Sequence, residues 1–203
     1  MRKKEKKKMN FLRNEEPYLR VTEYLKYKNS KRKENEKWNI SAMKPMPSFL
    51  YANKKVDVGG TVSLLTGSSV AKRGVTNFDG NSLVKGRVFV ANGITFKCAI
   101  DDASKPEQDI AYSIAKVPNT LMQSMVVVKQ KNEILIELPI CDILGATESG
   151  NHYFKLGSFA LLEDDTITEI EIQYPEGAKI TLEDGKALFA SARLSGFATY
   201  QKR

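Results

Sequence analysis

The chain has 203 residues, of which 41% are hydrophobic and 28% charged, so it can build the core of one ordinary domain plus an extension. The net charge of +8 is concentrated at one end. Residues 1–40 contain 14 Lys or Arg and 6 Asp or Glu, whereas the rest of the chain contains 18 of each. No run of 18 apolar residues occurs, so we expect no transmembrane helix. The sequence therefore predicts a basic N-terminal arm on an electrically neutral body.

The arm begins with a block of like charges. Six of the first eight residues are basic, and they are Arg2, Lys3, Lys4, Lys6, Lys7 and Lys8. Such a block repels itself and is expected to stay extended until an anionic partner neutralises it. No apolar stretch follows, so we do not expect a secretory signal peptide.

A short helix is predicted next. Asn14 can cap it, and Pro17 suits a position near its start. Val21, Tyr24 and Leu25 then recur at helical spacing, which predicts an amphipathic helix over residues 15–28. A second basic block overlaps the end of this helix and continues beyond it; it consists of Lys26, Lys28, Lys31, Arg32, Lys33 and Lys37.

The body is expected to begin after a linker. Residues 43–47 contain two prolines, and each biases its predecessor away from helix, which predicts an extended connection. We therefore divide the chain into an arm of residues 1–45 and a body of residues 46–203. In the body, apolar residues alternate with the period of strands. Strands are expected at residues 61–66, 84–91, 94–100, 110–116, 124–130, 133–138, 156–162, 167–174, 178–182 and 187–200.

Turn signals define the fold class. Asn92 and Gly93 lie between two β-rich runs, which predicts a tight hairpin, and Lys131 and Asn132 predict a second one. Residues 110–116 could form helix instead of strand. Nine or ten strands about ten residues apart are typical of an all-β antiparallel sandwich or barrel. Cys98 and Cys141 fall in apolar, strand-like runs, so we expect both thiols to be buried and reduced.

Nothing in the sequence marks a catalytic, metal or cofactor site. Structural zinc needs about four Cys or His ligands, and the chain has three, far apart. His152, the only imidazole, lies in a predicted loop, where a surface position is favoured over a catalytic one. The Gly- and Ser-rich residues 66–74 lack the Gly-Lys-Ser/Thr ending of a phosphate-binding loop. We therefore expect a protein that is not an enzyme and has no cofactor.

The two basic blocks are the candidate binding residues. Aromatic residues are interleaved with them, which suits stacking on single-stranded nucleic acid; they are Tyr18, Tyr24, Tyr27 and Trp38. A protein partner is the next interpretation, and an anionic membrane surface is less favoured. A solubilising tail without a partner stays open as the plainest alternative.

A basic, partly helical arm before an antiparallel sandwich resembles the jelly-roll coat proteins of viruses and phages. The resemblance implies a jelly-roll-like β-sandwich of about 8–10 strands that self-assembles into a shell. It implies that the basic residues at 2–8 and 26–37 contact packaged nucleic acid, neighbouring subunits or other virion proteins. It also implies a location in the virion after synthesis in the host cytoplasm.

Two other functions remain open. The chain could be a cellular β-sandwich module that binds single-stranded nucleic acid or carbohydrate, with a site among exposed aromatics near Tyr112 or Tyr153. It could also be a hydrolase with a carboxylate pair, although no specific pair is marked. The coat-protein interpretation predicts that deleting residues 1–40 leaves a folded body that assembles poorly.

Overall fold

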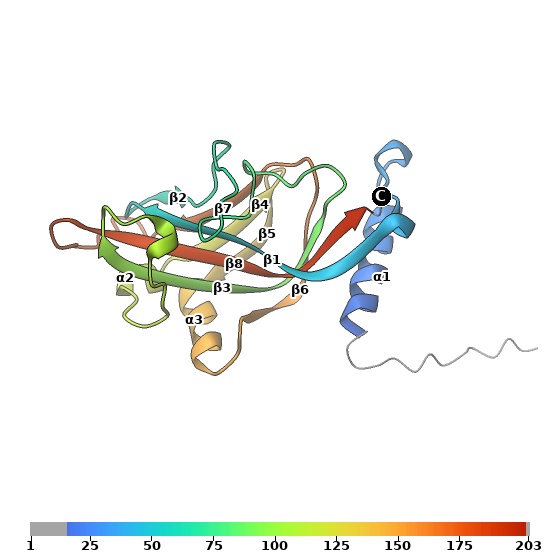
Figure 1. The fold of residues 1–203 in the computed structure, drawn as a ribbon. Coiled ribbons are helices and arrows are strands. Elements are labelled where there is room, and N and C mark those ends of the chain that lie inside the picture. The colour runs from blue at the N-terminus through green and yellow to red at the C-terminus, as the bar shows by residue number, and fades with distance from the viewer. Residues whose placement is uncertain (1–15, 202–203) are drawn as a thin grey trace, which may run out of the picture.

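The structure is a computed structural model that describes residues 16–201, so the first basic block lies outside the described residues. Two four-stranded antiparallel sheets face each other, and helix α1 (Glu16–Ser30) lies across one end of them (Figure 1). The predicted antiparallel β-sandwich is thereby confirmed. The helix expected over residues 15–28 occupies nearly the same positions.

The first sheet has the order β1-β8-β3-β6 and the second β2-β7-β4-β5. The strands of the first sheet are β1 (Met43–Val56), β8 (Lys186–Gln201), β3 (Phe89–Asp102) and β6 (Phe154–Leu162). Those of the second are β2 (Thr61–Ser63), β7 (Thr168–Gln173), β4 (Met125–Gln130) and β5 (Glu133–Pro139). The described chain also contains α2 (Asn119–Met122), α3 (Ile140–Glu148) and 3-10 turns at Glu34–Glu36, Ile40–Ala42 and Glu107–Asp109.

The pairing follows one rule. Strand β1 pairs with β8, β2 with β7, β3 with β6 and β4 with β5, so the numbers of these partners always sum to nine. Two further antiparallel pairs, β3 with β8 and β4 with β7, complete the sheets. The chain therefore folds as a long series of nested antiparallel pairs that is divided between two layers.

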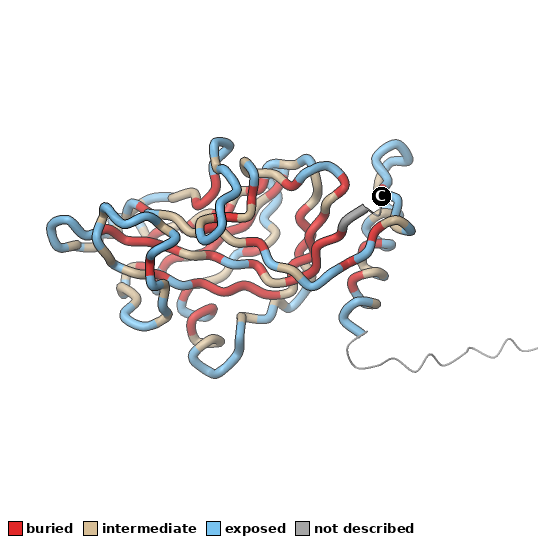
Figure 2. The backbone as a smooth tube through the Cα atoms, in the orientation of Figure 1, coloured by how far each residue is buried: buried red, intermediate tan, exposed pale blue. Residues whose placement is uncertain are grey.

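The main core lies between the sheets, because alternate residues of each strand point to the same face. Buried positions run along the strands (Figure 2); β7 alternates buried and intermediate residues, whereas β3 and β4 are buried over more than half of their length. In β3, the alternation of apolar residues predicts one inward face made of Ile94, Phe96, Cys98 and Ile100. The first three are each at most 2% exposed, but Ile100, near the end of the strand, is 45% exposed. Phe78, on the connection between β2 and β3, fills the same core.

One predicted hairpin is confirmed and the other is wrong. Lys131 and Asn132 both have positive φ, 52° and 60°, as a tight hairpin turn between β4 and β5 requires. At Asn92 and Gly93 the chain instead continues as β3, with a bulge between Ala91 and Gly93. A Cβ on Gly93 would lie 2.1 Å from Cδ2 of Tyr153. Glycine is therefore needed here because the Tyr153 ring packs against the backbone, and not because the chain turns.

The predicted linker at residues 43–47 is also wrong, because these residues form the start of β1. Tyr51 and Asn53 direct their N–H groups away from β8, to Oδ1 of Asn77 (2.9 Å) and the Val75 carbonyl (2.7 Å). Alternate residues share this orientation, so Pro45 and Pro47 lie where a missing N–H faces the free edge. Proline is tolerated at such an edge and blocks the addition of another strand.

Three smaller expectations are corrected. Residues 110–116 form only an isolated bridge between Ser113 and Cys98, and residues 178–182 form no strand. Cys98 is buried as expected, but Cys141 is exposed on α3. The run that contains Cys141 is helical because Ile140, Ile143 and Leu144 recur at helical spacing and bury one face of α3.

Candidate nucleic-acid and partner interface

Helix α1 packs on the outer face of the first sheet through a second apolar cluster. Val21 is fully buried and Leu25 is 1% exposed, although most of the other residues of the helix are exposed. The sheet contributes residues that point away from the main core; the cluster comprises Val21, Leu25, Trp38, Met43, Val88, Val90, Leu161 and Phe197. The second basic block is therefore carried on a helix that is part of the folded body.

A set of polar contacts around Trp38, here called the latch, holds the segment that follows the helix against the sandwich. The guanidinium of Arg32 lies 4.0 Å from the ring centre of Trp38, and its Nη1 lies 2.9 Å from Oε1 of Glu163. The Trp38 indole N–H donates to Oδ1 of Asp164 at 2.9 Å. Asn29 binds the backbone of Trp38 at both its N–H (2.8 Å) and its carbonyl (3.0 Å). Helix α1 and the turn after β6 are thus joined by contacts between residues far apart in the sequence.

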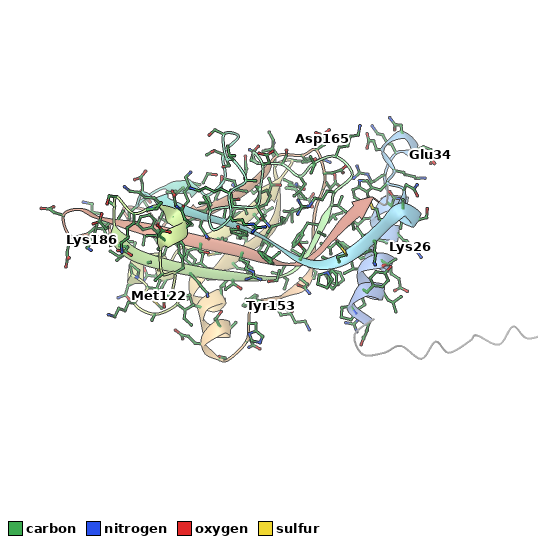
Figure 3. The ribbon with its side chains drawn as sticks, viewed as in Figure 1. Lys26, Glu34, Met122, Tyr153, Asp165 and Lys186 are labelled. Carbon is green, nitrogen blue, oxygen red and sulfur yellow. The ribbon has the colours of Figure 1, made fainter. Side chains whose placement is uncertain are left out.

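The second basic block is mostly exposed. Its six members lie on the second half of α1 and in the turn beyond it, with Lys26 at the end of the molecule opposite Lys186 (Figure 3). The exposed members are Lys26, Lys28, Lys31, Lys33 and Lys37. Arg32 is half-buried in the latch, so it acts in the structure of the protein rather than as an open binding group.

The interleaved aromatics divide into two groups. Tyr18 and Tyr27 are exposed and could stack on a ligand. Trp38 is buried, and Tyr24 packs on Phe159 with 5.3 Å between ring centres. The hydroxyl of Tyr24 donates to the Phe159 carbonyl, and burial raises its pKa. Half of the predicted stacking residues are therefore used to attach α1.

A second candidate site includes the two tyrosines near which the sequence analysis placed an alternative ligand site. A groove of about 1400 Å³ lies on the outer face of the first sheet, over β1, β8 and β3. Tyr112, Tyr153 and His152 all line it, with Tyr153 against Gly93 and the His152 carbonyl at Thr95. Pro17 of α1 lines it as well.

The walls of the groove are held by specific contacts. Tyr153 lies against the backbone at Gly93, and the carbonyl of His152 accepts a hydrogen bond from the Thr95 hydroxyl at 3.4 Å. Tyr112 donates to the Glu107 carbonyl at 3.1 Å. Burial, and to a lesser degree the negative charge of Glu107, raises the pKa of Tyr112 above its usual range, so its hydroxyl stays protonated.

Within residues 16–201, no group of three or more His, Cys, Asp or Glu side chains is placed to hold a metal ion. None of the helices in this range is long and apolar enough to cross a membrane. Comparison of the chain with protein families, with curated proteins and with solved structures found no match.

Proposed function

We propose that the chain is a virion structural protein with a jelly-roll fold that self-assembles into a shell. The observation that carries this proposal is the pairing in which partner numbers sum to nine, split between the orders 1-8-3-6 and 2-7-4-5. An eight-stranded double sheet built from two Greek keys is the jelly-roll arrangement, and viral capsid domains are prominent among the proteins that use it.

The placement of α1 supports a role in assembly. Five exposed lysines are carried on a segment that is anchored by Val21, Leu25 and Trp38, so their positions are fixed relative to the sandwich. A basic surface that is held in this way can present the same contact in every copy of a subunit. Weak contacts to nucleic acid or to a neighbouring subunit then add up over many copies.

The test is the solution mass of the full chain, measured by light scattering, with absorbance at 260 and 280 nm recorded on the same peak. A megadalton particle with excess absorbance at 260 nm is expected. A particle without that excess assigns the basic block to protein contacts. A monomer of the chain mass under all conditions contradicts self-assembly.

A matched pair of variants tests the role of the second basic block. Replacing its exposed lysines by Gln should reduce particle yield or nucleic-acid content; these are Lys26, Lys28, Lys31, Lys33 and Lys37. The control replaces five exposed lysines elsewhere on the body, namely Lys55, Lys72, Lys85, Lys179 and Lys186. Equal losses in both variants would show that total charge, not this surface, is what matters.

The groove favours a second candidate function, a cellular β-sandwich module that binds a ligand. Tyr112 and Tyr153, both half-buried, line it, and aromatic rings of this kind can pack against a ligand. This candidate predicts a monomer or small oligomer that binds its ligand without forming particles. The solution mass therefore separates the two functions.

A further inference from the structure

The floor of the groove is a regular array of side chains from three adjacent strands. Strand β8 lies in the middle, and its register aligns it with β1 on one side and β3 on the other. Three cross-strand rows result, each listed from β1 to β3: Phe49, Ser195 and Gly93; Tyr51, Arg193 and Thr95; Asn53, Ser191 and Lys97. The middle strand contributes two small side chains, Ser191 and Ser195, on either side of Arg193.

The β1 side of the floor is aromatic. Phe49 is 41% exposed, and its ring centre lies 5.8 Å from that of Tyr51. The Tyr51 hydroxyl accepts a hydrogen bond from the Gly74 N–H at 3.1 Å, which fixes the ring in place. Two adjacent, partly exposed rings form a surface on which planar groups can stack.

The centre and the β3 side are cationic. The Arg193 guanidinium lies 4.0 Å from the ring centre of Phe49, so it is held over the floor rather than free in solvent. Lys97 is exposed at the far row. None of the described residues that line the groove is Asp or Glu. The groove thus offers two positive charges and several hydrogen-bond donors, and the Glu107 carboxylate that acts on Tyr112 lies outside the lining.

The outer face of the other sheet has the opposite character. Around Lys129 on β4, the neighbouring strands contribute Glu137, Glu169 and Glu171, and Glu171 forms an ion pair with Lys129 at 2.7 Å. The positive charge of the groove is therefore a local feature of one face. It does not follow from the net charge of the body, which is zero after residue 40.

We propose that this groove binds a segment of single-stranded nucleic acid, with bases stacked on Phe49 and Tyr51 and phosphates bound by Arg193 and Lys97. The floor from Pro47 to Asn53 is about 20 Å long at the rise of a strand, enough for a few nucleotides. Sites that bind single strands without sequence specificity combine aromatic rings, on which bases stack, with positively charged side chains along the backbone. A neutral carbohydrate would stack on the same rings but would gain nothing from two cations. This site is separate from the basic blocks of the arm, and the proposal does not depend on particle assembly.

The experiment measures binding of a fluorescent oligothymidylate of about ten nucleotides to the full chain over a series of salt concentrations. The test variant is Lys97→Gln with Arg193→Gln. The control is Lys85→Gln with Lys186→Gln, which removes two exposed charges outside the groove. Each phosphate contact on a single strand contributes about 0.7 to the slope of log K against log salt, so the test variant should lower that slope by about 1.4. Its affinity should fall roughly tenfold or more near 0.1 M salt.

A third variant, Phe49→Ala, tests stacking, because loss of one stacked base lowers affinity at least about fivefold. Ultraviolet crosslinks from the oligonucleotide should fall in peptides that contain residues 48–53. Phe49, Lys97 and Arg193 are exposed, so their replacement should leave the fold intact. Thermal unfolding of each variant checks this.

Several results would overturn the proposal. One is an unchanged salt slope in the test variant, or an equal change in the control. A second is that the wild-type chain fails to bind the oligonucleotide. A third is that maltohexaose, a neutral probe, binds the groove and competes with the oligonucleotide while the cations prove dispensable. A change in particle mass without a change in oligonucleotide affinity would identify the groove as a subunit interface instead.

Discussion

The indole N–H of Trp38 lies 2.9 Å from Oδ1 of Asp164, although 126 positions separate the two residues. The second carboxylate oxygen of Asp164 accepts the Gly86 N–H at 2.6 Å. One carboxylate therefore joins the segment after α1 to two turns of the sandwich. The basic helix belongs to the fold through this contact as much as through its apolar face.

Replacing Trp38 by Phe should lower the free energy of unfolding by about 2 kcal/mol. The change removes the donor to Asp164 and leaves that carboxylate with one partner fewer in a half-buried position. It also removes part of the surface on which Arg32 stacks. Urea unfolding followed by far-ultraviolet circular dichroism measures the effect.

The matched control is Tyr27→Phe, which changes an aromatic residue of α1 that is 60% exposed. This variant should unfold within about 0.5 kcal/mol of the wild type. Equal stability of the Trp38 and Tyr27 variants would mean that the latch contributes nothing to the fold.

Two truncations distinguish the arm from the helix. Deleting residues 1–15 leaves every contact described above in place, so the body should stay soluble and unfold at the same temperature. Deleting residues 1–40 removes Val21, Leu25 and Trp38 and exposes the sheet residues beneath them. Because each buried side chain contributes about 1.5–3 kcal/mol, this truncation should lose several kcal/mol and aggregate.

This result would differ from the sequence-based expectation that the body folds well without residues 1–40. Solubility, light scattering and thermal unfolding of the two truncations provide the measurement. A well-folded, monodisperse protein lacking residues 1–40 would show that α1 is a detachable arm after all.

Gly93→Ala should destabilise the protein by roughly 1–3 kcal/mol, because the added methyl overlaps the Tyr153 ring. The cost should shrink in a Tyr153→Ala background, and the difference measures the coupling between the two positions. Gly157→Ala, in β6, is the matched control, since nothing lies within 4 Å of its added Cβ. Equal effects of the two glycine changes, both with and without the Tyr153→Ala change, would contradict the close approach.

The sequence predicted the elements whose signals are local. Alternation in β3 correctly predicted the burial of Ile94, Phe96 and Cys98, although it failed for Ile100 near the strand end. The Lys131–Asn132 turn was found because it separates two β-rich runs. The same local rule failed at Asn92 and Gly93. There Gly93 leaves room for the ring of Tyr153, and this contact between distant residues leaves no local sequence pattern.

The groove could not be predicted for the same reason. Arg193 lies between Tyr51 and Thr95 only because β8 pairs with both β1 and β3, and these residues are far apart in the chain. In addition, the prolines that made residues 43–47 resemble a linker concealed the strand that carries Phe49 and Tyr51. A proline on a free edge is compatible with a strand, and the sequence does not show which edge is free.

The two cysteines should differ sharply in reactivity. Cys141 is exposed on α3, whereas Cys98 is 2% exposed and burial raises the pKa of its thiol to about 11. A thiol-specific reagent at pH 8 should therefore modify one thiol per native chain and two in urea. Cys141→Ser should abolish the native reaction. Rapid modification of Cys98 in the native protein would contradict its burial.

The raised pKa of Cys98 also has a consequence for stability. Because the folded state favours the neutral thiol, its contribution is fully present below the ordinary pKa of 9.0 and is lost as the pH rises through about 11. The free energy of unfolding should fall over this range by about 2 kcal/mol more in the wild type than in Cys98→Ala. Burial, and after it Cys98, raises the pKa of Tyr174 to about 12, so Tyr174 is still mostly protonated at pH 11 and the comparison reports mainly on the thiol. Urea unfolding of both proteins at pH 8 and pH 11 measures the difference, and parallel pH profiles would show that Cys98 does not contribute.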